Sequence, residues 1–395
     1  MNLYYDPRSK QWLADDLGVF FGSSEALLKK ASANKNKLLC FHVQQNKTGA
    51  GPLIGIMAGR REDGAVTGNG LLFKELQKEI VKNGGLSVVF TPQDLKGNAI
   101  EGYIFSPKDN RWFSALCPLP HLVFNRIPFR KLEKTQAFFE AFQYFQDKKV
   151  PFFNEGFLDK FEIYQLLAAD PLLQPYIPET IPVVEQDILY GFLQKHCQTY
   201  LKPVHGAKGK GIYKLILEKT GTIRLDGIDE NFTFTDFRSF WQKWENIFTE
   251  KEYIIQKSIA PALYKGNRFD FRILVHYSKN GYLVTGAGIR QAKKQEITTH
   301  LPNGGMLLPY ELLQSDEHDQ FFKMIAERIG QILLKEKGFF GEFSIDAGLS
   351  SSDEYVIYEI NSKPMRFDEE EIEKKRLQNL TSLFFDMTGF KRLSQ

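Results

Sequence analysis

Residues 341–361 read GEFSIDAGLSSSDEYVIYEIN, two runs of alternating polar and apolar residues separated by a polar turn. Side chains that alternate with a period of two are typical of β-strands, so we predict strands at 341–349 and 355–361. The turn at 350–353 suits a hairpin. One face of the first strand then carries Glu342, Ser344 and Asp346, and one face of the second carries Tyr355, Ile357, Glu359 and Asn361.

This hairpin predicts a metal site. Asp346 would stand beside Glu359 and Asn361, and two carboxylates with an amide oxygen are hard ligands of the kind that Mg²⁺ takes. The remaining positions around the ion would be left for water and phosphate oxygens. The alternative is that all three are ordinary polar residues of an edge strand.

A second motif, KPVHGAKGKGI at 202–212, lies between two predicted strands. Glycines let backbone amides approach phosphate oxygens closely, and Lys202 at the strand end can reach the α and β phosphates. The motif is no Walker A sequence and no dinucleotide fingerprint, because no helix opens on it with the required spacing. The stretch can equally be a solvated turn. Its candidate phosphate-binding residues are Lys202, His205, Gly206, Ala207, Lys208, Gly209 and Gly211.

Lys160 follows Asp159, the predicted N-cap of a helix over 159–168. The helix dipole favours anions at this end, so a lysine in the first turn indicates an anionic partner such as phosphate. An exposed lysine with a negligible penalty is the plainer alternative.

Two arginines lie on a further predicted strand pair, 268–275 and 282–290, with a turn at 279–281. Arg272 and Arg290 could neutralise charge on a phosphoryl group or an acyl phosphate as it forms. Alternatively, Asp270 pairs with Arg268 or Arg272 in a structural salt bridge.

The composition indicates a folded protein without a strong external field. Of 395 residues 43% are hydrophobic, and Lys plus Arg is 51 against 48 for Asp plus Glu, so nucleic acid and membranes are not expected as partners. Three cysteines form no close pair, which fits a reducing compartment. We expect a soluble, cytoplasmic protein.

Pattern changes predict an α/β (α+β) chain with soft boundaries. We expect a β-rich N-terminal module at 1–50, a Rossmann-like β-α-β domain at 51–150 and a long α+β region at 151–395. A helix over 130–146 would carry Phe138, Phe142 and Phe145 on one core-facing side. The charge run at 370–375 is predicted to be a solvated helix face.

In their order along the chain, these features resemble the ATP-grasp superfamily over about residues 52–390. The stretches GPLIGIMAGR, LPHLVFNRIPFR, KPVHGAKGKGI, DFRILV and YEINSKP resemble, more narrowly, its YheC/YheD family from spore-forming bacteria. The resemblance implies ATP and Mg²⁺ as cofactors and an ATP-grasp fold for 151–395, with a glycine-loop subdomain at about 175–255 and a metal-binding, catalytic subdomain at about 256–395. It also implies an adenine-binding hinge at Gln256, Lys257, Ser258 and Ile259.

The function implied is a ligase that joins a carboxylate to an amine or thiol through an acyl phosphate. Arg290 with Arg272 would be catalytic, and its partners would be small-molecule or peptide carboxylates and amines. Substrate candidates are Asn125, Arg126, Arg130 and Lys363, although Arg126 and Arg130 could equally cap or brace the next helix. The family's description as endospore-coat-associated implies a spore-coat location and coat-protein partners. Alternatives are an ATP-binding structural protein without turnover, and an ATP-grasp kinase.

Overall fold

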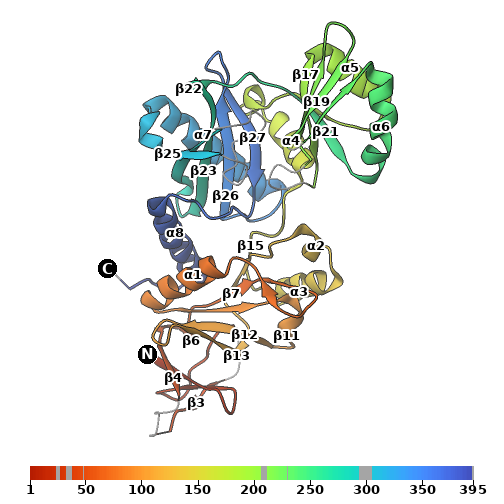
Figure 1. Ribbon diagram of the computed structural model, residues 1–395. Helices are drawn as coiled ribbons and strands as arrows, with labels where there is room; N and C mark the ends of the chain where they lie inside the picture. The colour runs from red at the N-terminus through yellow and green to blue at the C-terminus, as the bar shows by residue number, and fades with distance from the viewer. Residues whose placement is uncertain are drawn as a thin grey trace.

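The computed structural model describes residues 1–23, 27–32, 38–47, 49–205, 211–228, 230–292 and 305–393. Figure 1 shows an elongated molecule in which the chain begins at one end, builds a middle layer and then forms two lobes side by side. Helix α8 (Glu370–Thr388) returns the chain to the middle layer, where it lies against α1 (Gly70–Lys82). The mixed α/β class predicted from the sequence is confirmed.

The N-terminal module is built from short strands. Its sheet has the order β3-β2-β1-β4 and consists of β1 (Asn2–Asp6), β2 (Gln11–Ala14), β3 (Lys29–Lys30) and β4 (Leu39–His42). A hairpin of β5 (Gln44–Asn46) and β6 (Gly49–Gly51) follows. The predicted β-rich character of this part of the chain is confirmed.

The middle layer is a mixed sheet with the order β11-β12-β10-β7-β14-β15, to which β13 adds by pairing with β12. Its strands are β7 (Leu53–Met57), β10 (Leu86–Phe90), β11 (Leu95–Lys96), β12 (Ala99–Ser106), β13 (Arg111–Pro118), β14 (Leu122–Asn125) and β15 (Phe152–Phe153). Strands β7 and β10 are parallel and joined by α1, as the β-α-β prediction requires. A two-stranded hairpin, β8 (Gly59–Arg60) with β9 (Val66–Thr67), precedes α1.

The predicted helix over 130–146 is in fact two helices, α2 (Arg130–Glu133) and α3 (Gln136–Asp147). Thr135 takes an extended conformation between them, and its side chain accepts a hydrogen bond from the Phe138 amide as the N-cap of α3. The local capping interaction therefore divides the apolar pattern that predicted one helix. The aromatic side of α3 packs into the core as expected.

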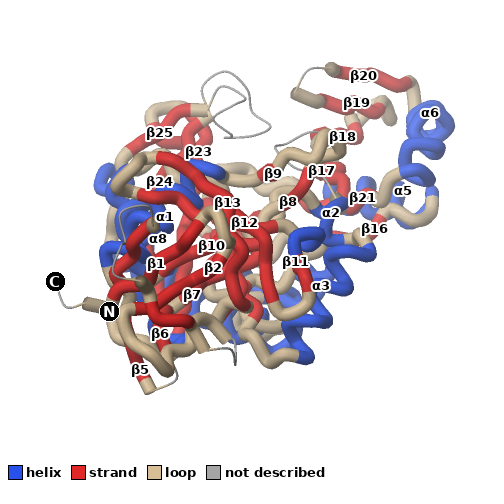
Figure 2. Tube along the Cα trace, turned by 90° about the horizontal axis from the view of Figure 1, so that it is seen from below, coloured by secondary structure: helices blue, strands red, loops and turns tan. Residues whose placement is uncertain are grey.

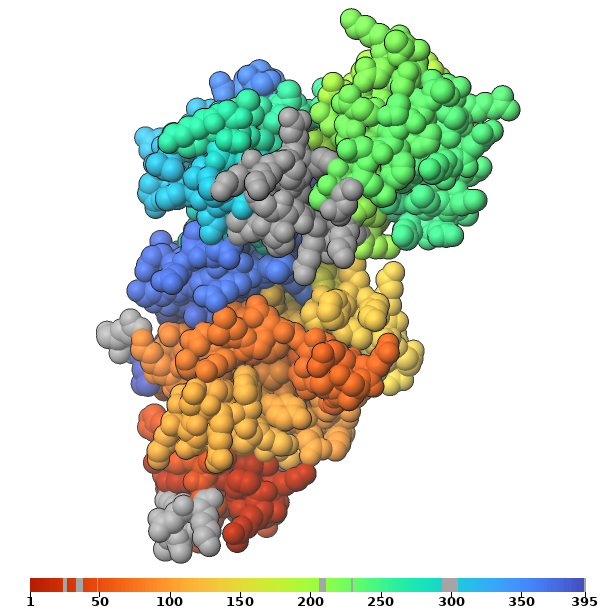
Figure 3. All heavy atoms as spheres, in the orientation of Figure 1, coloured from red at the N-terminus to blue at the C-terminus, as the bar shows by residue number. Residues whose placement is uncertain are grey.

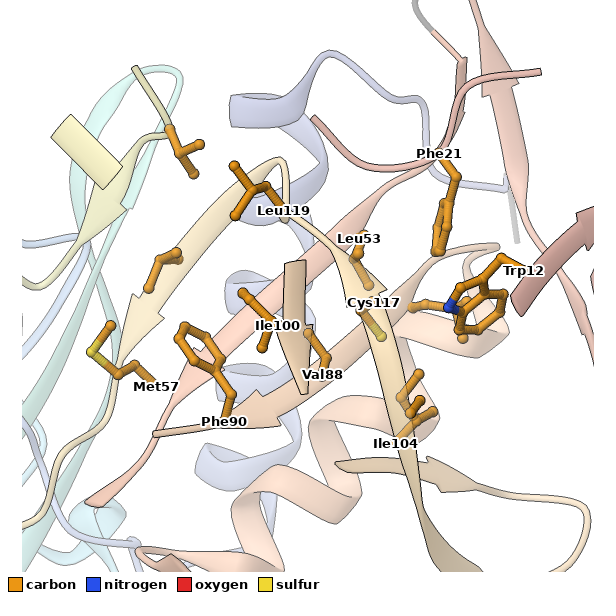
Figure 4. Close-up of a cluster of buried hydrophobic side chains, with 14 of the residues drawn as sticks. Trp12, Phe21, Leu53, Met57, Val88, Phe90, Ile100, Ile104, Cys117 and Leu119 are labelled. Atoms are coloured by element: carbon orange, nitrogen blue, oxygen red, sulfur yellow. The ribbon is translucent and has the colours of Figure 1, made fainter. Parts of the chain in front are cut away.

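The N-terminal module and the middle layer share one hydrophobic core. Figure 4 shows Trp12 and Phe21 of the module beside Val88, Ile104 and Cys117 of the middle layer, and all five belong to one buried cluster. The Trp12 indole also donates a hydrogen bond of 2.9 Å to the Leu116 carbonyl. The module is thus fixed to the layer beneath the two lobes.

The first lobe, drawn in green in Figure 3, is an antiparallel sheet with the order β16-β21-β17-β18-β19-β20. Its strands are β16 (Thr180–Pro182), β17 (Gln198–Pro203), β18 (Tyr213–Leu217), β19 (Ile223–Asp226), β20 (Asn231–Phe234) and β21 (Tyr253–Lys257). Helices α5 (Gln186–His196) and α6 (Phe237–Glu250) share a core with one face of this sheet. In Figure 2 the end of this lobe, β18 to β20 with α6, projects from the rest of the molecule.

The second lobe is an antiparallel sheet with the order β25-β24-β23-β26-β27, to which β22 adds by pairing with β23. Its strands are β22 (Leu263–Tyr264), β23 (Asn267–Ser278), β24 (Gly281–Gln291), β25 (Met306–Leu308), β26 (Glu342–Leu349) and β27 (Tyr355–Asn361). Helix α7 (Asp316–Glu336) packs on one face, and α8 packs on part of the other. Helix α4 (Lys160–Ala168) lies between the lobes (Figure 1).

The predicted faces of the deciding hairpin are correct for β26 and wrong for half of β27. Phe343, Ile345 and Ala347 pack against α7, so their polar neighbours point to the opposite face. On β27 the register shifts, because Asp346 pairs with Glu359 while the next residue, Ala347, pairs with Ile357. This bulge turns Ile357 into the α7 core, away from the face that carries Glu359.

No helix in the described ranges is long and apolar enough to cross a membrane.

Candidate functional site

The acidic part of the candidate site lies where β26 and β27 pair. Asp346 and Glu359 are direct partners in the register, and the Asn361 side-chain amide donates a hydrogen bond of 3.2 Å to Asp346 Oδ2. Neighbouring positions on paired strands bring their side chains within about 4.5–5.5 Å at Cβ. The hairpin therefore gathers the three predicted metal ligands.

Two lysines reach this acidic group from outside the sheet. Lys160 Nζ lies 3.4 Å from Glu359 Oε1, and Asp159 caps the helix below it by accepting from the Phe161 and Glu162 amides. Lys202, on β17 of the first lobe, donates a hydrogen bond of 2.5 Å to Gln256 Oε1. Lys202 thus contacts its own lobe, and the charges of Lys160 and Glu359 act on it from outside that lobe.

The charges within this site act on one another. Burial, together with the positive charge of Lys160, lowers the pKa of Lys202 to about 8, while Glu359 opposes the shift. Burial likewise raises the pKa of Asp346 to about 6, with Arg272 opposing and the charge of Glu359 adding. The charges of Lys202 and Asp346 are therefore only partly balanced by their neighbours in the site.

The donor set fits a magnesium ion. The neighbouring charge of Glu359 adds to the cost of ionising Asp346, and a dication between the two carboxylates would remove that cost. Among the described residues no cluster of three His, Cys, Asp or Glu occurs. Two carboxylates with an amide oxygen are therefore the hard oxygen ligands that this site offers to Mg²⁺.

The predicted arginines lie on the same face as the acidic group. Arg272 pairs in register with Asp346 across β23 and β26, and Arg290 pairs with Asp270 across β24 and β23. Both guanidinium groups stand over the Phe367 ring, at 5.2 Å and 5.8 Å from its centroid. Arg268 and Asp270 form an ion pair of 3.3 Å, one of the structural salt bridges considered for this strand.

Sequence reasoning missed two residues of this group, Phe367 and Glu369. Phe367 is fully buried in the segment between β27 and α8, and Glu369 makes a bidentate ion pair with Arg290. The solvated face of α8 was predicted correctly, since Glu370, Glu371, Lys374 and Lys375 are exposed. Glu369 stands immediately before that acidic run, and nothing local distinguishes it from its neighbours.

Only the ends of the predicted glycine loop are described. Gly206, Ala207, Lys208 and Gly209 lie outside the described residues. His205 is held between Asp159 and Glu252, at 3.8 Å and 3.3 Å from their carboxylate oxygens. Gly211 has a φ of +74°, a left-handed conformation that glycine adopts without strain.

The predicted hinge is strand β21 and the residues just after it. Gln256 is buried, and its side chain links strands β17 and β16 of the first lobe. It accepts a hydrogen bond from Lys202 and donates one to Thr180 Oγ1. The amides of Lys257 and Ser258 donate to the carbonyls of Glu179 and Gln198. Ile259 follows with a half-exposed side chain.

The four substrate candidates lie at the junction of the middle layer and the second lobe. Lys363 is nearly buried and pairs with Glu133, while its ammonium also donates to Asn125 Oδ1 at 2.9 Å. Burial lowers its pKa to about 8. Arg126 pairs with Glu342 at 3.1 Å, and burial lowers the pKa of Arg126 to about 10. These contacts tie the two parts of the molecule together.

Arg130 differs from the other three candidates. It opens α2 and donates a single hydrogen bond of 2.6 Å to the Leu158 carbonyl, with its guanidinium over the Phe157 ring. Burial lowers the pKa of Arg130, and the carboxylates of Asp159, Glu359 and Glu133 oppose that shift. Its charge thus acts on the same acidic group as Lys160.

Known proteins resemble this chain in sequence and in fold. "Endospore coat-associated protein YheD" of Bacillus subtilis (strain 168) is 29% identical over 336 residues, which are 80% of this chain and 73% of that protein. "Endospore coat-associated protein YheC" of the same organism is 24% identical over 307 residues, 74% of this chain and 84% of its own length. VanG D-Ala:D-Ser ligase from Enterococcus faecalis shares the fold, with a TM-score of 0.51 and 12% identity over 86% of this chain and 99% of that one.

The family model described as "YheC/D like ATP-grasp" matches residues 149–386, which contain both lobes and α8 except its last residues. The chain therefore belongs to the YheC/D-like ATP-grasp family.

Proposed function

We propose that this chain is an ATP- and magnesium-dependent ligase that joins a carboxylate to an amine or a thiol by way of an acyl phosphate. The observation that carries the proposal is the meeting of Lys160 and Lys202 with Asp346, Glu359 and Asn361 between two sheets. A polyphosphate with its metal needs cations for the phosphates and hard oxygen ligands for the metal, and this site supplies both.

Each described residue would have a separate role. Lys160 and Lys202 would hold the α and β phosphates. Asp346, Glu359 and Asn361 would hold Mg²⁺, which supplies neutralising charge for the phosphate oxygens. Gln256 to Ile259 would border the adenine.

The reaction needs no nucleophilic side chain. In the first step a substrate carboxylate oxygen bonds to the γ-phosphorus, and the bond to the β–γ bridging oxygen breaks with its electron pair leaving on ADP. In the second step an amine or thiol attacks the acyl carbon and loses its proton to solvent as phosphate departs. Arg272 and Arg290 would stabilise the negative charge that gathers on the phosphoryl and acyl oxygens.

The carboxylate substrate would enter at the junction of the middle layer and the second lobe. Arg130 is the strongest of the four candidates, because Arg126 and Lys363 are already paired with Glu342 and Glu133. Asn125 would support the site through its contact with Lys363. The substrates would be small molecules or peptides, and an association with the spore coat is proposed because both relatives are named endospore coat-associated proteins.

The test is to incubate the purified protein with magnesium ATP, pools of carboxylates and hydroxylamine, and to measure both ADP release and acyl hydroxamate. Hydroxamate is expected with at least one pool, because hydroxylamine intercepts an acyl phosphate. Glu359→Ala should abolish the signal, and Glu354→Ala, which alters an exposed carboxylate in the adjoining turn, should not.

Tight ATP binding with no ADP above the buffer rate in any pool would contradict the ligase and favour an ATP-binding coat component without turnover. ADP with a phosphorylated hydroxyl product and no hydroxamate would identify a kinase.

A further inference from the structure

The two arginines proposed to stabilise the reacting group differ in how they are satisfied. Arg290 makes two hydrogen bonds to Glu369, from Nη1 to Oε1 at 2.5 Å and from Nη2 to Oε2 at 3.0 Å. Arg272 has a buried Nε without a hydrogen-bond partner, and its guanidinium forms no ion pair with any residue in the described part of the chain. Arg290 is therefore paired with a carboxylate, whereas Arg272 has no ion-pair partner among the described residues.

Both guanidinium groups belong to one cradle, which we define as Arg272, Arg290, Gly288 and Phe367. The Phe367 ring lies beneath both arginines, and Gly288 is the register partner of Arg272. A Cβ at position 288 would lie 2.1 Å from Glu369 Oε1 and 2.8 Å from Arg290 Nη1. The missing side chain of Gly288 leaves the space that the Glu369 carboxylate fills.

Glu369 pairs with Arg290 of this cradle although the N-terminus of α8 is also within its reach. It is the N-cap residue of α8, and the positive end of the helix dipole attracts a carboxylate at that position. Its side chain makes no capping hydrogen bond and instead reaches Arg290, 79 residues away in the sequence. A bidentate carboxylate–guanidinium pair is the stronger interaction, so the cradle holds a carboxylate in preference to the helix end.

We propose that Glu369 is an internal competitor for the cradle, and that an oxyanion of the substrate displaces it from Arg290. This inference rests on the proposed function, because the oxyanion is the γ-phosphoryl group of ATP or the acyl phosphate made from it. The anion meets Arg272 first, since that guanidinium has no ion-pair partner among the described residues, and it gains Arg290 when Glu369 moves away. Glu369 is accessible enough to move, with 23% of its side chain exposed.

The consequence is a measurable cost on binding the γ-phosphoryl group. A ligand that must displace an internal group binds with an affinity reduced by the fraction of protein in which the site is open. The cost falls on ATP and not on ADP, because only ATP carries the group that reaches the cradle. Removing the Glu369 charge should therefore raise the preference for ATP.

The experiment compares the affinities for magnesium ATP and magnesium ADP by titration calorimetry in the wild type, Glu369→Gln and Glu369→Ala. The ratio of the two affinities should shift toward ATP by about three- to tenfold in both variants. Glu371→Ala is the matched control, because it removes the same charge two residues later on the exposed side of α8, and its ratio should equal that of the wild type. Glu369→Gln keeps the shape of the side chain and guards against a folding defect in the alanine variant.

The outcomes separate this inference from the function on which it rests. If the wild type binds both nucleotides and the ratio stays the same or falls in the Glu369 variants, the competitor is wrong and Glu369 is a strut that positions Arg290. If the wild type binds neither nucleotide, the proposed function fails together with the inference.

Discussion

Glu342 and Asp346 lie four residues apart on the same face of β26, yet their surroundings have opposite effects. Burial alone would raise the pKa of Glu342, but the charges of Arg376 and Arg126, together with the His276 imidazole whose Nε2 lies 3.3 Å from Glu342 Oε1, hold it far below the ordinary range. Arg376 reaches Glu342 through two hydrogen bonds, of 2.6 Å and 3.0 Å. Burial raises the pKa of Asp346 to about 6, since only Arg272 and Arg290 oppose the shift and Glu359 and Asp270 add to it.

Glu342 belongs to a network that holds the fold together, whereas Asp346 lies in the candidate binding site. Around Glu342 every charge has a partner, and the network joins the middle layer, β26 and α8. Around Asp346 the pairing is incomplete, which costs free energy in a half-buried place unless a ligand completes it. Incomplete neutralisation near Asp346 is therefore what we expect of a place where metal and phosphate bind.

The largest effect is expected from breaking the satisfied network. Glu342→Gln leaves Arg376 and Arg126 buried without their counter-charge, so we expect a loss of about 3–5 kcal/mol in the free energy of unfolding. Denaturant titration measures it. The control Glu371→Ala, on the exposed side of α8, should change stability by less than about 0.5 kcal/mol. A loss below about 1 kcal/mol for Glu342→Gln would show that the two carboxylates do not differ as described.

The next largest effect is expected from replacing Asp346, the carboxylate whose charge is only partly balanced. Asp346→Asn should weaken binding of magnesium ATP by about tenfold or more while the protein stays folded, because the proposed metal ligand loses its charge. The pKa of Asp346 in the folded protein, about 6, is above its ordinary value of 3.8, so folding favours the protonated form. The stability that this contributes is present below pH 3.8 and is lost as the pH rises through 6.

The asparagine variant should consequently have a higher thermal midpoint than the wild type at pH 8 and an equal one near pH 4, in the absence of metal. Thermal unfolding at the two pH values checks the sign. A lower midpoint at pH 8 would mean that Asp346 is a structural partner of Arg272 and no metal ligand.

A smaller effect concerns Lys202. Its pKa in the folded protein, about 8, is below the ordinary 10.5, so the lysine loses its charge as the pH rises through 8. Nucleotide binding should restore that charge, and near pH 9 we expect the uptake of close to one proton with each magnesium ATP. Calorimetry in two buffers of different ionisation enthalpy measures the uptake. Lys202→Met should abolish it, and an unchanged uptake in that variant would assign the proton to another group.

The smallest effect on stability is expected from Ser344, which lies between Glu342 and Asp346 on β26. Ser344 is fully buried on the same face, and its hydroxyl has no hydrogen-bond partner within the described ranges. Ser344→Ala removes an unsatisfied polar group, so stability should stay the same or rise by up to about 1 kcal/mol, with magnesium ATP affinity unchanged. A marked loss of affinity would place the hydroxyl in the site instead.

Much of the fold was predictable because its elements are specified locally. The alternation on β26 and the capping of α4 by Asp159 depend on residues a few positions apart, and each element of the β7-α1-β10 unit has its own local pattern. The break between α2 and α3 was not predicted, because the apolar pattern runs through Thr135 and only its capping bond ends the continuity. The bulge on β27 was missed for a similar reason, since a period of two gives no sign of an extra residue.

The sequence by itself determined the family, the α/β class, and the order in which the candidate lysines, arginines and acids follow one another. The tertiary structure alone decided which of those charges are satisfied. Arg126 meets Glu342 over 216 residues and Lys363 meets Glu133 over 230, so two candidate substrate residues are already paired. Glu369 joins Arg290 over 79 residues. Local patterns specify backbone conformation, whereas the neutralisation of a charge depends on partners that only the folded chain brings within a few ångströms.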